Sequence, residues 1–141
     1  MNLPSLQTAL RSNAIFSTLC GLDLVLFTDQ INALVGSSIP PLFLQGLGAL
    51  LIIFAVDVLW ISSRNPINIK VTKVIIAMDW AWVASTPLVL IFAWNLLTPI
   101  GVEIICTIAA TVALFAVLQS KGIQRESDHL MHNQAPQAQH T

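Results

Sequence analysis

Hydrophobic residues along this chain fall into four long stretches separated by short polar segments. The expected helices cover residues 13–36, 39–62, 71–97 and 98–120. A helix needs about 20 apolar residues to cross the roughly 30 Å hydrocarbon core of a bilayer, and each stretch reaches that length. The pattern therefore predicts a transmembrane domain of four helices within residues 1–120.

The segments between these stretches contain residues that typically end or begin helices. Gly36 predicts a short turn after the first helix. The segment 63–70 contains Pro66 between two asparagines, together with two cations, and predicts a hydrated loop. Thr98 followed by Pro99 is typical of the N-cap and first residue of a helix. The last segment, residues 121–141, is polar and is expected to be a disordered cytoplasmic tail.

The positive charges lie at the ends of the four stretches or outside them. They are Arg11, Arg64, Lys70, Lys73, Lys121 and Arg125. If four helices cross the membrane, all six cations face one side, which the positive-inside rule identifies as the cytoplasm. The sequence therefore predicts an all-α, antiparallel four-transmembrane-helix bundle with its N and C termini in the cytoplasm. The expected location is the cytoplasmic (inner) membrane.

Composition points the same way. Hydrophobic residues make up 55% of the chain and charged residues 9%, against roughly 25% charged residues in ordinary soluble domains. The formal net charge is −1. Six dispersed cations form no basic stripe, so binding to nucleic acid is not expected.

Tryptophans and cations near the helix ends are expected at the membrane interfaces. This group comprises Trp60, Trp80, Trp82, Trp94, Arg64, Lys70 and Lys73. Tryptophan rings are enriched at the level of the lipid headgroups, which favours this placement. The alternative is that the tryptophans pack between helices, and Trp82 lies deep enough for either.

Acidic residues inside the predicted spans are the unusual feature. Asp23, Asp29, Asp57, Asp79 and Glu103 all lie there, although an ionised group costs about 2.5–3.5 kcal/mol at the centre of a membrane. At about 1.5 Å per residue from the predicted cytoplasmic ends, Asp57 and Asp79 lie at roughly 7–9 Å depth and Asp23 at about 15 Å. Asp29 and Glu103 share a layer near the outer interface. Without a cation nearby, Asp23 must face polar groups or water, or take a proton.

Asp23, Asp57 and Asp79 form the candidate intramembrane polar site, for which two interpretations stay open. In the first, the acids make hydrogen bonds that fix how the helices pack. In the second, they line a hydrated cavity open to the cytoplasm and bind a cation or relay protons. Arg64, seven residues after Asp57 on the same helix face, is one cation that can reach inward to compensate a carboxylate.

The predicted spans hold no set of residues that identifies a reaction. All three histidines lie in the tail, so haem ligation, a serine–histidine hydrolase and a histidine zinc site lack their ligands or base. Cys20 and Cys106 are expected to be free packing residues. We therefore predict no enzymatic activity, no metal and no cofactor.

Small residues predict where helix backbones come close. Gly46, Gly48 and Ala49 in the second helix, and Ala109, Ala113 and Ala116 in the fourth, offer such contacts. Packing within the chain is the preferred interpretation, and contact between copies of the chain is the alternative.

Residues 77–85, which read A-M-D-W-A-W-V-A-S, resemble a segment of small bacterial four-helix integral membrane proteins without assigned activity, in the pattern A-x-D-x-A-W-V. Residues 10–17, followed by Gly21 and Leu22, are similar to the first helix of that family. The resemblance covers residues 10–120 and implies the fold and the location, and it singles out Asp79 and Trp82. A more distant similarity to DoxX-type proteins rests on size and helix number.

Together these observations predict a small non-enzymatic membrane component or partner subunit. Its expected partners are the lipid bilayer and either other membrane proteins or a second copy of the chain. The alternative is proton- or cation-linked permeation that uses the intramembrane carboxylates Asp23, Asp57 and Asp79.

Overall fold

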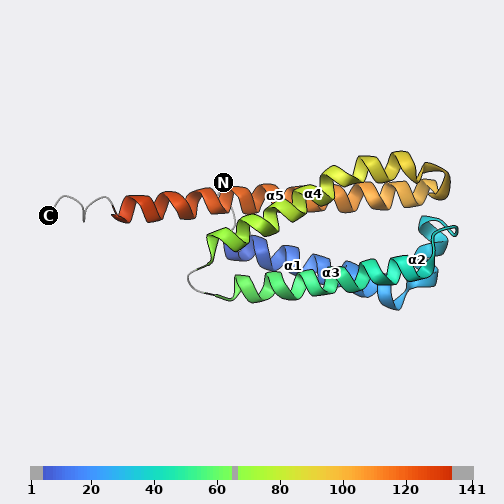
Figure 1. Ribbon diagram of the computed structural model, residues 1–141, viewed down its shortest axis with the longest axis horizontal. Helices are drawn as coiled ribbons and strands as arrows, with labels where there is room; N and C mark the ends of the chain where they lie inside the picture. The colour runs from blue at the N-terminus through green and yellow to red at the C-terminus, as the bar shows by residue number, and fades with distance from the viewer. Residues whose placement is uncertain (1–4, 65–66, 135–141) are drawn as a thin grey trace.

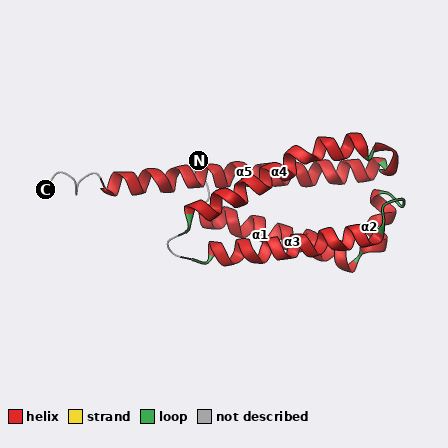
Figure 2. Cartoon of the chain, viewed as in Figure 1, coloured by secondary structure: helices red, strands yellow, loops and turns green. Residues whose placement is uncertain are grey.

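The computed structural model of the protein describes residues 5–64 and 67–134, and every regular element in them is helical (Figure 2). The elements are α1 (Leu6–Leu26), α2 (Thr28–Val35), α3 (Pro41–Ser62), α4 (Ile69–Phe92), the short 3₁₀ helix η1 (Trp94–Leu96) and α5 (Pro99–Gln134). Among them, α1, α3, α4 and α5 are long and apolar enough to cross a membrane. This is the length and composition of a multi-pass membrane protein, and it confirms the prediction of an all-α chain with four apolar helices.

The long helices pack as two pairs. α1 packs along α3 and α4 packs along α5, while α1 also contacts α5 and α3 contacts α4 only slightly. Figure 1 shows the chain reversing direction between successive long helices. The start of α1, the end of α3 and the start of α4 therefore lie toward one end, here called the loop end, and α2 lies at the other. α5 continues past the other helices at the loop end (Figure 1).

The buried apolar core lies at the loop end. It consists of Leu6, Leu10, Ala14, Ala55, Val58, Ile75, Ile76 and Ile123. These residues come from all four long helices, so this core joins the two helix pairs. Burial of such side chains is the main contribution to packing between the pairs at this end.

At the opposite end, the start of α5 is attached to the end of α2. The backbone N–H of Thr98 donates to the carbonyl oxygen of Val35 at 2.8 Å, and its hydroxyl donates to the carbonyl oxygen of Leu34. The Thr98 hydroxyl also accepts from the N–H of Gly101 at 2.9 Å, which confirms its predicted role as a helix N-cap. Gly101 lies against the backbone of Val35, where a Cβ would not fit.

The first helix begins earlier than the expected residue 13. Ser5 caps it by accepting a hydrogen bond from the N–H of Thr8 at 3.2 Å. Leu6 and Leu10 are buried in the core, so packing stabilises a segment that hydropathy alone assigns to the region before the span. A polar N-cap followed by buried apolar residues explains the earlier start.

The predicted helix 13–36 is interrupted near residue 27, where α1 ends and α2 begins. The hydroxyl of Thr28 donates back to the carbonyl oxygen of Leu24 at 2.6 Å, a contact that bends helices because it competes with the backbone hydrogen bond. Asp23 therefore lies near the far end of α1, roughly 25 Å from Leu6 at 1.5 Å per residue. The expected depth of Asp23 was counted from a helix start at residue 13, whereas α1 starts at Leu6 and ends at Leu26.

The third helix was expected over residues 71–97, but α4 ends at Phe92 and η1 follows. The N–H of Leu96 donates to the carbonyl oxygen of Ala93 at 2.8 Å, which is a 3₁₀ contact. The chain must reverse before Pro99, and a residue that precedes proline disfavours the α conformation. The apolar residues of 93–97, which hydropathy assigns to the third span, therefore form the turn between α4 and α5.

The polar segment after residue 120 is helical through Gln134, and the expected disorder is not found over residues 121–134. Gly122 packs against Leu6, so that a Cβ at this position would lie 3.1 Å from it, and Ile123 is buried. Residues 124–134 contain no glycine or proline and continue the helix with residues of mostly good helix propensity. The rest of the expected tail, 135–141, and Pro66 in the expected loop lie outside the described residues.

Candidate functional site: a buried carboxylate held by two amides

Asp79 of α4 lies inside the protein with 4% of its surface exposed. The Nδ2 of Asn13 donates to its Oδ2 at 2.7 Å, and the Nε2 of Gln119 donates to the same oxygen at 3.1 Å. Asn13 and Gln119 are fully buried. One carboxylate oxygen therefore links α1, α4 and α5, and these three residues are called the Asp79 cluster.

Helical spacing explains why these three polar residues face inward. Asn13 follows the buried Leu10 by three residues, and Asp79 follows the buried Ile76 by three. Gln119 lies three residues after Ala116 and four before Ile123, both buried. Residues three and four apart share one face of a helix, so each polar side chain is directed into the region where the apolar residues pack.

Two oxygen atoms in the cluster have no hydrogen-bond partner within residues 5–64 and 67–134. They are the Oδ1 of Asn13 and the Oε1 of Gln119, both buried. In the arrangement observed, the amide N–H groups face the Asp79 carboxylate and suit its ionised form. A half-turn of either amide would instead direct its oxygen toward Asp79, which suits a proton on that carboxyl or a small cation beside it. The cluster therefore has the groups needed to hold a proton or a cation.

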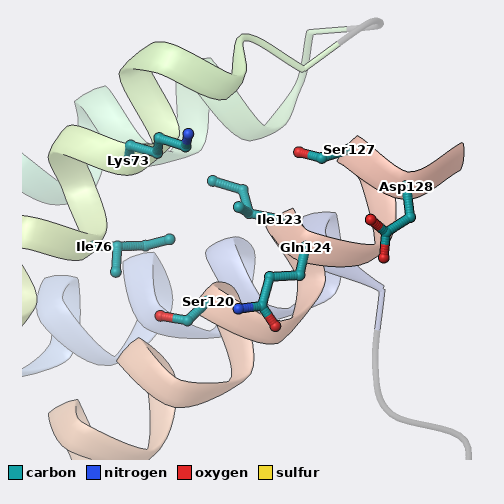
Figure 3. A pocket seen from close by; sticks show the side chains of 7 residues that line it. All are labelled: Lys73, Ile76, Ser120, Ile123, Gln124, Ser127 and Asp128. Atoms are coloured by element: carbon teal, nitrogen blue, oxygen red, sulfur yellow. The ribbon is translucent and has the colours of Figure 1, made fainter. Parts of the chain in front are cut away.

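A cavity of about 550 Å³ lies between α4 and α5 next to the cluster (Figure 3). It is lined by Lys73, Ile76, Ser120, Ile123, Gln124, Ser127 and Asp128. Ile76 and Ser120 lie within one helical turn of Asp79 and Gln119, so the inner wall of the cavity adjoins the cluster. Figure 3 shows Lys73 and Ile76 extending from α4 toward Ile123 and Ser127 of α5.

The structure does not bring the three acids of the predicted site together. Asp79 is buried, whereas Asp23 and Asp57 are exposed. Within the described residues, the hydrogen-bond partners of Asp79 are the two amides and neither of the other acids. Two residues at the same depth along their helices can point in different directions, because depth does not determine the face on which a side chain lies.

Asn13 and Gln119 were not among the predicted site residues. The sequence pattern could have identified Gln119, because apolar residues three positions before it and four positions after it lie on the same helix face. Asn13 is the first residue of the helix that hydropathy predicts, and polar residues are common at helix starts. The earlier start of α1 brings it inside.

Arg64 does not compensate Asp57. Its guanidinium lies over the ring of Trp60, 4.3 Å from the ring centre, which is a cation–π contact. Asp57 has no hydrogen bond or ion pair with any described residue, although Arg64 lies two helical turns away on the same face. The carboxylate therefore faces outward without a partner among the residues that the structure describes.

The expected interfacial residues are mostly exposed. Lys70, Lys73, Arg64, Trp60, Trp80 and Trp94 are exposed, and Trp82 is half-buried. Trp94 belongs to η1 and not to the third long helix. The half-buried ring of Trp82 agrees with either placement considered for it.

Cys20 and Cys106 are free thiols, as predicted, but Cys106 is exposed and Cys20 is half-buried, so the expected packing role does not hold for Cys106. Within residues 5–64 and 67–134, no three His, Cys, Asp or Glu side chains come close enough to hold a metal ion. Among the buried polar residues that the structure describes, Asp79 is the one with an ionisable carboxyl group.

Comparison with known proteins does not assign the chain to a family, since no protein-family model, curated protein or solved structure matches it. The resemblance of residues 77–85 to small bacterial four-helix membrane proteins stays a prediction. The function must therefore be inferred from the chemistry of the residues themselves.

Proposed function

We propose that this protein is a non-enzymatic subunit of a larger membrane complex. The observation that carries the proposal is the exposure of Asp57 on α3. Asp57 lies roughly 8 Å from the end of α3 at Ser62, at 1.5 Å per residue. Ionisable residues within membrane spans almost always face the interior of a bundle or a wet cavity and have a partner. Asp57 is exposed and has no partner among the described residues, so a second protein is the most direct way to cover it.

Asp79 has a different role in this proposal. It is already paired with Asn13 and Gln119, and it holds three helices of the chain in register. Polar contacts of this kind between membrane helices contribute roughly 0.6–2 kcal/mol each. The chain thus uses one acid for its own fold and leaves another at its surface for a partner.

The proposal is tested by extracting the protein with its surrounding lipid in polymer-bounded discs and weighing the particles by native mass spectrometry. The expected particle contains this chain and at least one different membrane polypeptide in a fixed ratio. The Asp57→Asn variant is expected to yield more of the chain without its partner, because the amide loses the charge but keeps the shape. Particles that hold only this chain under mild extraction would contradict the subunit role.

We further infer that both termini lie in the cytoplasm and that the long helices form an antiparallel bundle. The support is the placement of Arg11, Arg64, Lys70 and Lys73 toward the loop end, together with the start of α1 and the far end of α5 (Figure 1). An excess of Lys and Arg on one side of the spans predicts that this side is cytoplasmic.

Labelling of single cysteines by a reagent that cannot cross membranes tests this topology. The background carries Cys20→Ser and Cys106→Ser. In intact cells, Ser38→Cys, which lies at the end of the molecule opposite the loop end, is expected to react. Asn68→Cys at the loop end is expected to react only after the cells are opened. Reaction of both sites from outside, or of Asn68→Cys alone, would exclude this orientation.

Proton- or cation-linked transport is the second candidate. It is favoured by the two unpartnered amide oxygens beside Asp79 and by the cavity that adjoins them. In this interpretation the cavity between α4 and α5 gives access from the loop end, and the apolar side chains of Ile76 and Ile123 separate it from the cluster. Transport requires a carboxyl at position 79, whereas a purely structural role requires only a hydrogen-bond acceptor there.

A further inference from the structure

α3 carries a row of exposed residues on the face turned away from α1, the helix against which it packs in this chain. The row consists of Phe43, Gly46, Leu50, Ile53, Asp57 and Trp60, all exposed, and is called the α3 stripe. Successive members are three or four residues apart, which is the spacing of helix positions that meet another helix. The residues that α3 buries in this chain, including Gly48, Ala55 and Val58, lie on the opposite face.

Gly46 leaves open space in the stripe. A Cβ built at this position meets no atom within 4 Å, so this chain makes no use of the missing side chain. Gly48 is different, because it lies directly against Gly21 of α1. Glycines on the surface of membrane helices allow a neighbouring backbone to approach closely. Gly46 therefore leaves room for a close approach that no described helix of this chain occupies.

Asp57 determines the chemistry of that outside helix. The rest of the stripe is apolar or aromatic, and the nearest cation along the helix face, Arg64, lies over Trp60 instead. A carboxylate below the membrane surface is stabilised by a cation at the same depth, since Coulomb attraction is strong where water is excluded. The α3 stripe therefore fits a helix that is mostly apolar and carries a basic residue.

A second copy of the chain fits the stripe less well. Two copies related by a two-fold axis along the membrane normal would place Asp57 against Asp57, and like charges at close range disfavour ionisation of both groups. The described part of α3 has no basic residue that would meet Asp57 in such a pair. Charge complementarity selects a different protein.

We propose that the α3 stripe binds a single transmembrane helix of a partner protein, whose lysine or arginine pairs with Asp57 and whose backbone approaches Gly46. This inference rests on the proposed role as a membrane subunit. It adds the chemistry of the partner and the surface that receives it.

The test uses the full-length protein in lipid nanodiscs and a synthetic apolar helix of about 22 residues, long enough to span. One probe carries a single lysine at the depth of Asp57, and the matched probes carry leucine or glutamate there. Binding is measured by energy transfer between dyes on the probe and the protein. The lysine probe is expected to bind about tenfold more tightly than the leucine probe, in line with the upper range for polar contacts between membrane helices, and the glutamate probe more weakly still.

Three variants assign the binding to the stripe. Asp57→Asn is expected to remove the preference for lysine, and Asp57→Lys is expected to prefer the glutamate probe. Gly46→Ile is expected to weaken binding of the lysine probe without changing resistance to detergent unfolding. Glu103→Gln, which removes another exposed acid, is the control and is expected to bind the lysine probe as the unaltered protein does.

Equal binding of the lysine and leucine probes would overturn the inference, and so would equal effects of Asp57→Asn and Glu103→Gln. Energy transfer between two copies of the chain that Asp57→Asn abolishes, without probe binding, would assign the stripe to self-association and also overturn it. If native particles contain a partner and Asp57→Asn does not reduce the amount bound, only the proposal that the α3 stripe is the docking surface is contradicted. A native particle that contains the chain alone contradicts the subunit role itself.

Discussion

Replacing Gly48 by valine is expected to lower the free energy of unfolding by about 3 kcal/mol, the upper range for overpacking a tight contact. A Cβ at position 48 would lie 2.7 Å from the carbonyl oxygen of Gly21 and 2.8 Å from the Cβ of Leu24. Neither contact is with the flexible end of a side chain, so α1 and α3 must move apart. The predicted loss follows from separating the two helices where Gly21 and Gly48 pack against each other.

Gly46→Val is the matched control, because position 46 lies on the same helix and meets nothing within 4 Å. Its effect is expected to stay within about 0.5 kcal/mol, as for ordinary surface substitutions. Both variants are measured by titrating the purified protein from mild detergent into sodium dodecyl sulfate and following helix content and tryptophan fluorescence. Equal losses in the two variants would show that helix α3 tolerates no added side chain anywhere, and the close contact with Gly21 would not be the cause.

The two glycines also show what the sequence can and cannot predict about packing. The sequence predicted that Gly46 and Gly48 lie at close helix contacts, yet only Gly48 does so in this chain. Positions two apart on a helix point in nearly opposite directions. Choosing between them requires the position of the neighbouring helix, which a count of small residues does not contain.

Local signals predicted the number of long helices and part of their boundaries. The lengths of the apolar stretches indicated four spans, and four described helices have that length and composition. Thr98 and Pro99 correctly marked the start of α5. These features depend on residues close together in the chain, which is why the sequence alone contains them.

The candidate site could be predicted only in part, because the spans are apolar on almost every side. In a soluble protein the polar face of a helix shows which side faces water. A helix in lipid is apolar on both faces, so its sequence pattern does not show which face packs against the other helices. Asp57 and Asp79 were assigned the same depth, and one is exposed while the other is buried. The amides that hold Asp79 come from helices far away in the sequence, so no local pattern joined the three residues.

Replacing Asp79 by leucine is expected to lower the free energy of unfolding by about 2–6 kcal/mol, since a buried donor without an acceptor costs about 1–3 kcal/mol. Leucine would leave the side-chain N–H groups of Asn13 and Gln119 without the carboxylate oxygen to which both donate. Asp79→Asn keeps an acceptor oxygen at the same place, and its expected cost is about 1 kcal/mol, the net value of a typical hydrogen bond. The same detergent titration measures both variants.

Combining Asp79→Leu with Asn13→Leu and Gln119→Leu distinguishes the effect of unpaired hydrogen-bond donors from the effect of altered side-chain packing. If unpaired donors cause the instability, the triple variant is expected to be more stable than Asp79→Leu alone, because replacing all partners of a buried polar group by apolar groups is often nearly neutral. Further loss in the triple variant would mean that the cluster contributes mainly through its packing.

The stable Asp79→Asn variant then decides between the two proposed functions. In sealed vesicles that contain the purified protein, proton and sodium fluxes are followed with internal dyes. A subunit whose Asp79 only holds helices together is expected to show no flux with either residue and to bind its partner equally well with both. Flux through the unaltered protein that Asp79→Asn abolishes while the fold is retained would assign the Asp79 cluster to transport, because the amide keeps the hydrogen bonds and removes the titrating group.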